Sequence, residues 1–259
     1  MENSRLEEQA RYLWSGESDR TELLCLSQHF GPLSMDEAYA IQSLGLKLRL
    51  AQGMSLTGWK MGLTSLAKRQ QMNLDAAIFG YLLSEKKIEG DVFSIGRLIH
   101  PKIEPEIGFR LKKKLSKKIT LSEAESYVES VAPALEIIDS RYKGFKYFSL
   151  PDVVADNCSA SHFIWGKELP YRPGMNLCDL DMKLSIDEKV VESATAKEIS
   201  GNPLESIVGL SELLEKYQIC AETNSLVLAG SATNAVQLKA GMRVALQVSG
   251  MSDLKLMIS

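Results

Sequence analysis

Two glutamates, Glu104 and Glu106, are separated by a single residue within residues 99–107. Side chains alternate between the two faces of an extended segment, so both carboxylates would lie on one face and Ile103 and Ile107 on the other. Converging carboxylates repel each other unless a cation lies between them, and hard divalent cations prefer oxygen ligands. The spacing therefore predicts a candidate metal site; the alternative is a pair of solvated glutamates on a strand face.

A third glutamate, Glu136, lies within the otherwise apolar residues 132–138. Burying a carboxylate is costly unless it is paired with a cation or bound to a metal. Pairing of the two acidic segments in one sheet would bring Glu136 to Glu104 and Glu106 as a third ligand. The alternative partner for Glu136 is a nearby cation such as Arg141.

The two acidic segments must be positioned by the elements around them. Pro105 has no backbone N–H to give to a strand ladder, so the first segment is expected to be an edge strand or to contain a bulge, and not to be a central strand. Thr120 and Glu123 have the spacing of a capping box, which predicts a helix through Tyr127 to Val131. This helix would connect the two acidic segments, so both can lie in one sheet.

Lys60 is a candidate catalytic residue. In the strand predicted here, its side chain shares a face with Gly58 and Gly62, which leave space for a small molecule beside the amine. Thr64 or Ser65 can cap the helix predicted to follow, and a helix N-terminus beside the lysine would favour a carboxylate. The alternative is a snorkelling lysine, with a buried stem and an ammonium group in solvent.

The composition indicates an ordinary globular protein of 259 residues, with 45% hydrophobic and 24% charged residues and a formal charge of -3. This charge gives no reason to expect binding to nucleic acid or an anionic membrane, and the basic residues 112–118 lack interleaved aromatics. The four cysteines are too widely spaced for a zinc site or a disulfide framework. Because residues 1–8 lack an apolar signal core and no apolar run can span a bilayer, we expect a cytoplasmic protein with reduced thiols.

Two regions differ in their patterns. Residues 1–55 are expected to form an N-terminal helical region, with one helix interrupted by a polar break at residues 15–19 and a second that begins with a capping box at Ser34 and Glu37. Residues 56–259 are expected to form a metal-binding catalytic domain rich in β-strands.

Four segments resemble motifs of the fumarylacetoacetate hydrolase superfamily: residues 58–65, 99–107, 135–142 and 154–157. They are similar to its branch of 2-oxo-3-hexenedioate (4-oxalocrotonate) decarboxylases and 2-hydroxypenta-2,4-dienoate hydratases. The resemblance covers most of the chain and is strongest in its central part. It implies an α+β fold, a mixed β-rich roll with surrounding helices.

The resemblance also implies how the site is composed. It implies Mg2+ or Mn2+ held by Glu104, Glu106 and Glu136, an active-site lysine at Lys60, and a small-molecule 2-oxo-enedioate as substrate. Further contacts with the substrate are predicted at Thr64, Ser65, Lys102, Asp139, Arg141 and Ser161.

Two features favour a decarboxylase over a hydratase within this branch. The hydratases resemble one another in a Pro-Asp-Phe-Gly motif, and this chain has Ile78 at the position of its aspartate. Residues 138–142 resemble the form of their motif that the decarboxylases have. We therefore predict a divalent-metal-dependent decarboxylase that converts 2-oxo-3-hexenedioate to 2-hydroxypenta-2,4-dienoate and CO2 in the meta-cleavage degradation of aromatic compounds. A homo-oligomer is expected, and a complex with a partner hydratase is considered as well.

The alternatives stay open at this point. They are a 2-hydroxypenta-2,4-dienoate (2-keto-4-pentenoate) hydratase, a weaker case for an acylpyruvate hydrolase, and a non-catalytic partner subunit of the same fold. The last is motivated by three departures from the family pattern. Asn202 stands where the family usually has the histidine of Gly-His-Pro, and Met242 where it usually has the aspartate of a Gly-Asp pair. Ala229 lies in the segment where it usually has Thr-Gly-Gly. Retention of all three glutamates and Lys60 argues against it.

Overall fold

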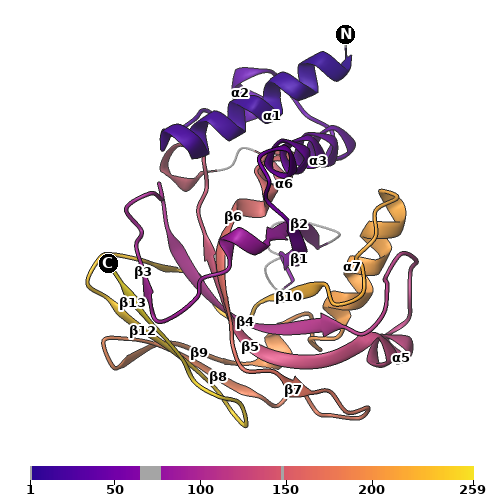
Figure 1. The fold of residues 1–259 in the computed structure, drawn as a ribbon, viewed down its shortest axis with the longest axis vertical. Helices are drawn as coiled ribbons and strands as arrows, with labels where there is room; N and C mark the ends of the chain where they lie inside the picture. The colour runs from indigo at the N-terminus through magenta and orange to yellow at the C-terminus, as the bar shows by residue number, and fades with distance from the viewer. Residues whose placement is uncertain (1, 65–76, 147–148) are drawn as a thin grey trace.

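The computed structural model describes residues 2–64, 77–146 and 149–259 (Figure 1). The helices are α1 (Glu2–Asp19), α2 (Leu26–His29), α3 (Met35–Ala51), α5 (Leu121–Ala124), α6 (Leu150–Ala155) and α7 (Glu205–Lys216). The strands are β1 (Leu56–Gly62), β2 (Ile78–Leu83), β3 (Val92–Phe93), β4 (Lys102–Leu111), β5 (Val128–Ile138), β6 (Ala160–Trp165), β7 (Leu169–Pro170), β8 (Asp181–Ile186), β9 (Lys189–Thr195), β10 (Leu226–Ser231), β11 (Val236–Gln237), β12 (Arg243–Val248) and β13 (Leu254–Ile258). The predicted α+β class is confirmed.

The larger sheet has the strand order β2-β1-β10-β4-β5-β6, and the short strands β11 and β7 add to β4 and β5. β1 and β10 are parallel, whereas β4 is antiparallel to both of its long neighbours, so the sheet is mixed. Its two ends meet, because Ile88, which follows β2, donates its N–H to the Phe163 carbonyl of β6 at 2.8 Å. The sheet therefore curls into the predicted β-rich roll.

The inside of the roll is marked by a small apolar cluster of Leu82, Ala134, Phe163, Leu226 and Leu228. β2 and β6 stand at opposite ends of the strand order, so their side chains meet across the inside of the roll. The outer face carries larger side chains that join the main core of the molecule. The inner face therefore carries the smaller of the two apolar clusters.

A five-stranded sheet, β3-β13-β12-β8-β9, lies at the end of the molecule opposite to the N-terminal helices (Figure 1). α7 buries Ile207, Leu210 and Leu214, whose spacing is that of one helix face, and they join the main core with residues of both sheets. α3 begins with the predicted capping box. All four cysteines are free, as predicted.

β4, the strand of the first acidic segment, is a central strand, so the prediction of an edge strand is wrong. The Pro101 carbonyl accepts from Leu238, just after β11, and the Leu111 N–H donates to Ser225, just before β10. Backbone groups of every second residue along a strand point to the same side, so the backbone of Pro105 also points toward β10 and β11. On that side the ladder is interrupted, since β10 pairs as far as Glu106 and β11 resumes at Ile103. The proline therefore lies at an irregularity, where its missing donor is tolerated.

The prediction of a helix through Val131 is also wrong. The capping box is present, but α5 ends at Ala124 and β5 begins at Val128 after a single 3-10 turn. Val128 pairs with Leu111 at the end of β4, and the register continues along both strands. Strand pairing has overridden a local helix signal, because β-branched residues pack well on a pleated surface.

The predicted polar break at residues 15–19 is helical, and α1 ends with it at Asp19. The helix expected after the break is confined to α2. Tertiary contacts explain why the polar residues are helical. Gly16 lies so close to Leu23 that an added Cβ would be 2.5 Å from a methyl carbon. Glu17 forms an ion pair with Arg49 of α3. The polar residues thus hold the C-terminal end of α1 against its neighbours.

One buried side chain of α1 predicts a stabilising substitution. Gln9 is fully buried, and neither polar atom of its amide has a hydrogen-bond partner in the described part of the chain. Gln9→Leu should remove the cost of two unsatisfied groups and stabilise the fold by about 1–3 kcal/mol. Thermal denaturation should record a rise in Tm of several degrees.

Gln42 provides the matched control. It is also buried, but its amide donates to the Phe79 and Val154 carbonyls at 2.9 and 3.0 Å. Gln42→Leu should therefore lower Tm, because it leaves those two carbonyls without their donor. A fall in Tm for Gln9→Leu as well would contradict the assignment of Gln9 as unsatisfied.

Candidate active site and metal centre

Strand register brings the predicted lysine and glutamates to the inner face of the roll. Lys60 of β1 pairs with Leu228 of β10, and Leu228 pairs with Gly108 of β4. Paired residues project from the same face, and Gly108 shares its face with Glu104 because their separation in the strand is even. Glu104 in turn pairs with Glu136 of β5. The lysine and the glutamates therefore project into one space.

The three glutamates form a compact cluster. One carboxylate oxygen from each of Glu104, Glu106 and Glu136 lies within 4.8 Å of the others. Both Glu106 and Glu136 are 0% exposed. Lys60 Nζ lies 3.0 Å from Glu136 Oε2, and the Gly230 N–H donates to Glu106 Oε2 at 2.7 Å. Within the part of the chain that the structure describes, the Lys60 ammonium group thus faces the three carboxylates.

The cluster fits a hard divalent cation. Glu106 Oε1 and Glu136 Oε1 are buried without a hydrogen-bond partner in the described residues, and the contact of Glu136 Oε2 with Lys60 is an ion pair without hydrogen-bond alignment. Burial, and then repulsion from Glu136, raises the pKa of Glu106 well above its usual range. Oxygen ligands without histidine or thiolate suit Mg2+ or Mn2+ better than zinc.

Lys60 is 4% exposed, so its ammonium is inside the protein and the alternative of a snorkelling lysine is wrong. Burial alone would lower the pKa of Lys60, but attraction to Glu136 outweighs it and raises the pKa above its usual range. The side chain therefore stays charged. The ammonium donates a hydrogen bond to the Cys158 carbonyl, at 3.3 Å. A permanently charged amine suits electrostatic stabilisation and not nucleophilic attack.

A cavity of about 160 Å3 adjoins this cluster. Lys60, Thr64 and Glu104 contribute to its lining, as three of the predicted site residues. The remaining wall is largely apolar and includes Ile78, Ile138, Phe145 and Val153. The cavity is large enough for a small organic acid, and its described lining combines two charged side chains with apolar ones.

Two other predicted substrate contacts lie close to the cavity or at a loop beside it. Lys102 Nζ lies 4.0 Å from the centre of the Phe145 ring, which lines the cavity. Asp139 accepts hydrogen bonds from the backbone N–H groups of Ile99 and His100, so its carboxylate holds the chain that enters β4. Ser65 lies outside the described residues.

Arg141 and Ser161 do not line the cavity. The Arg141 guanidinium forms a buried ion pair with Asp156 and also donates to the Asp139 carbonyl at 2.8 Å. Ser161 Oγ lies 2.8 Å from His162 Nδ1. A role of either side chain in binding substrate stays a prediction, and the contacts seen here connect loops of the protein.

The structure adds groups to the site that the sequence pattern did not reveal. The Gly230 N–H and the Cys158 carbonyl are backbone groups, and Ser159 and Ser231 line the cavity. Gly230 has φ +100, and a Cβ there would collide with the Thr64 side chain. Of these groups, Gly230 could have been found from the sequence, because glycine is the residue that adopts positive φ without strain. Backbone donors and acceptors occur in every sequence, so they give no such signal.

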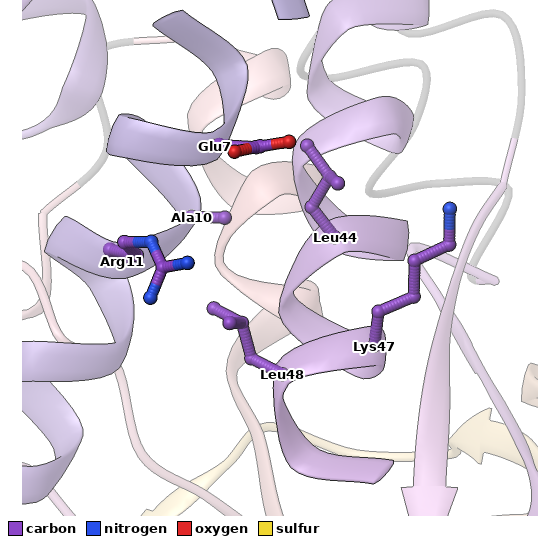
Figure 2. Close-up of a pocket in the computed structure, with 6 residues that line it drawn as sticks. All are labelled: Glu7, Ala10, Arg11, Leu44, Lys47 and Leu48. Carbon is purple, nitrogen blue, oxygen red and sulfur yellow. The ribbon is translucent and has the colours of Figure 1, made fainter. Parts of the chain in front are cut away.

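A second hollow, of about 240 Å3, lies between α1 and α3 (Figure 2). Leu44 and Leu48 of α3 face Ala10 of α1, and the charged side chains of Glu7 and Arg11 also border it. Within the described ranges, the grouping of carboxylates suited to a metal occurs at Glu104, Glu106 and Glu136. The cavity beside that grouping is therefore the candidate active site.

None of the helices within the described ranges combines the length and apolar character needed to cross a bilayer.

Comparisons with known proteins agree with this geometry. The chain is 41% identical over 223 residues to a 4-oxalocrotonate decarboxylase of a Pseudomonas species, covering 86% of each chain. It is 29% identical to 2-keto-4-pentenoate hydratase 2 of Dechloromonas aromatica, covering 94% of each. In structure it is similar to 4-oxalocrotonate decarboxylase from Pseudomonas putida G7 complexed with magnesium and adipate, with TM-score 0.94, 28% identity, and 99% and 98% of the two chains covered.

The family comparison covers all strands of the roll after β2. Residues 88–258 match the family described as fumarylacetoacetate (FAA) hydrolase C-terminal. This range contains Glu104, Glu106 and Glu136, whereas Lys60 precedes it. The chain therefore belongs to the fumarylacetoacetate hydrolase family.

Proposed function

We propose that this protein is a divalent-metal-dependent decarboxylase that converts 2-oxo-3-hexenedioate to 2-hydroxypenta-2,4-dienoate and CO2. The observation that carries the proposal is the composition of the cavity, where Ile78 lines the same space as Lys60 and Glu104. Hydration would need a proton-transfer group, and Ile78 has none. The similarity to decarboxylases over most of the chain supports the same reaction.

The proposed reaction requires no nucleophile. The bond between C5 and C6 breaks, the C6 carboxylate leaves as CO2, and the electron pair moves through the alkene to the C2 oxygen. A divalent cation held by Glu104, Glu106 and Glu136, Mg2+ or Mn2+, would act as a Lewis acid that stabilises this negative charge. Proton uptake by the resulting oxygen gives the dienol product.

Lys60 supplies a second positive charge in the proposed site. Its ammonium is held by Glu136 and the Cys158 carbonyl, so its position is set before substrate arrives. A preorganised charge stabilises the transition state without reorganisation at the moment of reaction. Thr64, which lines the same cavity, and Lys102, beside Phe145, are proposed substrate contacts.

The second candidate function is 2-keto-4-pentenoate hydratase, because relatives with that name align over nearly the whole chain. The non-catalytic alternative receives less support. Asn202 accepts a hydrogen bond from the Leu204 N–H at the start of α7, and Ala229 is fully buried in β10. Two of the departures thus have structural contacts, while the acidic cluster and Lys60 are retained.

The chain is proposed to consist of two regions with different roles. Residues 56–259 would form the catalytic unit, and residues 1–55 would support it through contacts such as the Leu23 N–H to the Arg141 carbonyl, at 2.9 Å. We propose a cytoplasmic homo-oligomer, with a hydratase that consumes the dienol product as a second partner.

The first test addresses the metal. Glu106→Gln should weaken Mg2+ binding by at least about tenfold, because it removes a charged ligand. Without metal its Tm should not fall, because the substitution also removes repulsion from Glu136. Calorimetric titration with Mg2+ measures the affinity. Glu129→Gln, on the exposed part of β5, is the control and should bind Mg2+ normally; equal affinities in both variants would remove Glu106 from the site.

The second test addresses the reaction. In the presence of Mg2+, the purified protein should release CO2 from 2-oxo-3-hexenedioate faster than it hydrates 2-hydroxypenta-2,4-dienoate, because Ile78 cannot exchange a proton with water. Both reactions are followed in parallel, by CO2 release and by loss of dienoate absorbance. The opposite ratio would identify a hydratase, and the absence of both would identify a non-catalytic subunit.

The third test addresses Lys60. Lys60→Met keeps much of the stem and removes the charge, so kcat should fall by roughly two to three powers of ten, as when one preorganised donor is lost. KM should change less, because the charge acts mainly on the transition state. Steady-state kinetics measure both, with the exposed β8 lysine variant Lys183→Met as control. Near-normal kcat with a large loss of Tm would instead give Lys60 a structural role.

A further inference from the structure

Three consecutive residues beside the cavity have an unusual backbone conformation. Asn157, Cys158 and Ser159 have φ of 50°, 51° and 59°. Residues other than glycine rarely adopt this left-handed conformation, and they do so as single residues in most proteins. Such a turn persists only where its surroundings determine it.

The Asn157 side chain holds the turn against the edge of β2. Its Oδ1 accepts from the Tyr81 N–H at 2.8 Å, and its Nδ2 donates to the Tyr81 carbonyl at 3.1 Å. The amide thus replaces a neighbouring strand at this edge. Gly80 makes the approach possible, since a Cβ there would be 2.7 Å from the Asn157 carbonyl oxygen.

Further bonds hold the end of the turn. The Ser159 N–H donates to the Asp156 carbonyl at 2.9 Å, and the Asp139 N–H donates to the Ser159 carbonyl at 2.8 Å. The Cys158 thiol donates to the Phe79 carbonyl at 3.2 Å, and burial raises the pKa of this thiol to about 12, so it stays protonated as a donor. The turn is therefore tied to β2 and to the end of β5.

The consequence reaches Lys60. The turn directs the Cys158 carbonyl at Lys60 Nζ, 3.3 Å away, while Glu136 Oε2 lies 3.0 Å away on the same ammonium group. An ammonium has three N–H donors. One hydrogen bond to the carbonyl and one ion pair with the carboxylate, at different positions, limit its rotation as well as its location. The carbonyl can do this only while the left-handed turn is kept.

We propose that Asn157 is a positioning residue for Lys60: its amide, paired with Tyr81, holds the left-handed turn whose Cys158 carbonyl orients the Lys60 ammonium. This inference rests on the proposed role of Lys60 in turnover. Asn157 is not among the residues that line the cavity, and its amide bonds to Tyr81, so its effect passes through the turn.

Asn157→Gly tests the proposal most directly. Glycine adopts positive φ without strain, so this variant removes the amide pairing and adds no backbone conflict. We expect kcat to fall on the order of tenfold to a hundredfold, as for a small misplacement of a catalytic group. The Mg2+ affinity measured by calorimetry should stay unchanged, because Glu104, Glu106 and Glu136 do not depend on the turn.

Asn224→Gly is the matched control. Asn224 also has positive φ, 70°, but it is exposed and precedes β10, away from the cavity. Its kcat and Mg2+ affinity should equal those of the unsubstituted protein. If Asn157→Gly does not fold, Asn157→Asp keeps the acceptor for the Tyr81 N–H, loses the donor to the Tyr81 carbonyl, and should lower kcat with unchanged Mg2+ affinity.

A double-mutant cycle then separates positioning from general support. In the Lys60→Met background, Asn157→Gly should lower kcat no further, because the group that it positions is absent. Multiplying effects would overturn the proposal, as would an Asn157→Gly variant with normal kcat or with kcat and Mg2+ affinity reduced together. These outcomes differ from failure of the proposed function, in which the unsubstituted protein itself releases no CO2.

Discussion

Repulsion among three converging carboxylates is the constraint on which the rest of the structure depends. Glu106 and Glu136 are fully buried, and Lys60 is the partner found for Glu136. Within the described residues, Glu106 Oε1 and Glu136 Oε1 have no hydrogen-bond partner, and buried charge is costly unless balanced. A divalent cation bound here would offset the repulsion among the carboxylates. The same cluster would weaken the fold without the cation, and so couples metal binding to stability.

The roll meets this constraint by presenting small residues and backbone groups around the charged ones. Gly108 lies beneath the Trp165 ring, where a Cβ would collide with it. Gly230 brings its N–H to Glu106 because it can adopt φ +100 next to Thr64. Larger residues at these positions would displace the strands that set the carboxylate spacing. The inner face thus keeps space at the centre, while the outer face packs the main core.

Sequence patterns predicted features that depend on local periodicity, and also the pairing of the two acidic segments, in which Glu104 lies opposite Glu136. The separation of Glu104 and Glu106 placed both on one face, and the apolar surroundings of Glu136 pointed to a buried, compensated carboxylate. The central position of β4 was missed, because the gap that tolerates Pro105 is formed by β10 and β11, far along the chain. Strand pairing likewise overrode the helix signal before Val131. The Cys158 carbonyl could not be predicted, because every residue has one.

The choice of a backbone carbonyl as the hydrogen-bond acceptor for Lys60 has an electrostatic reason. A carboxylate at the position of Cys158 would orient the ammonium equally well, but it would add another buried negative charge beside Glu136. A carbonyl is a neutral acceptor, so it directs the ammonium and adds no charge to the site. Holding that carbonyl requires a strained turn and the amide of Asn157. The site thus avoids a further buried charge, and the fold instead bears the strain of the turn.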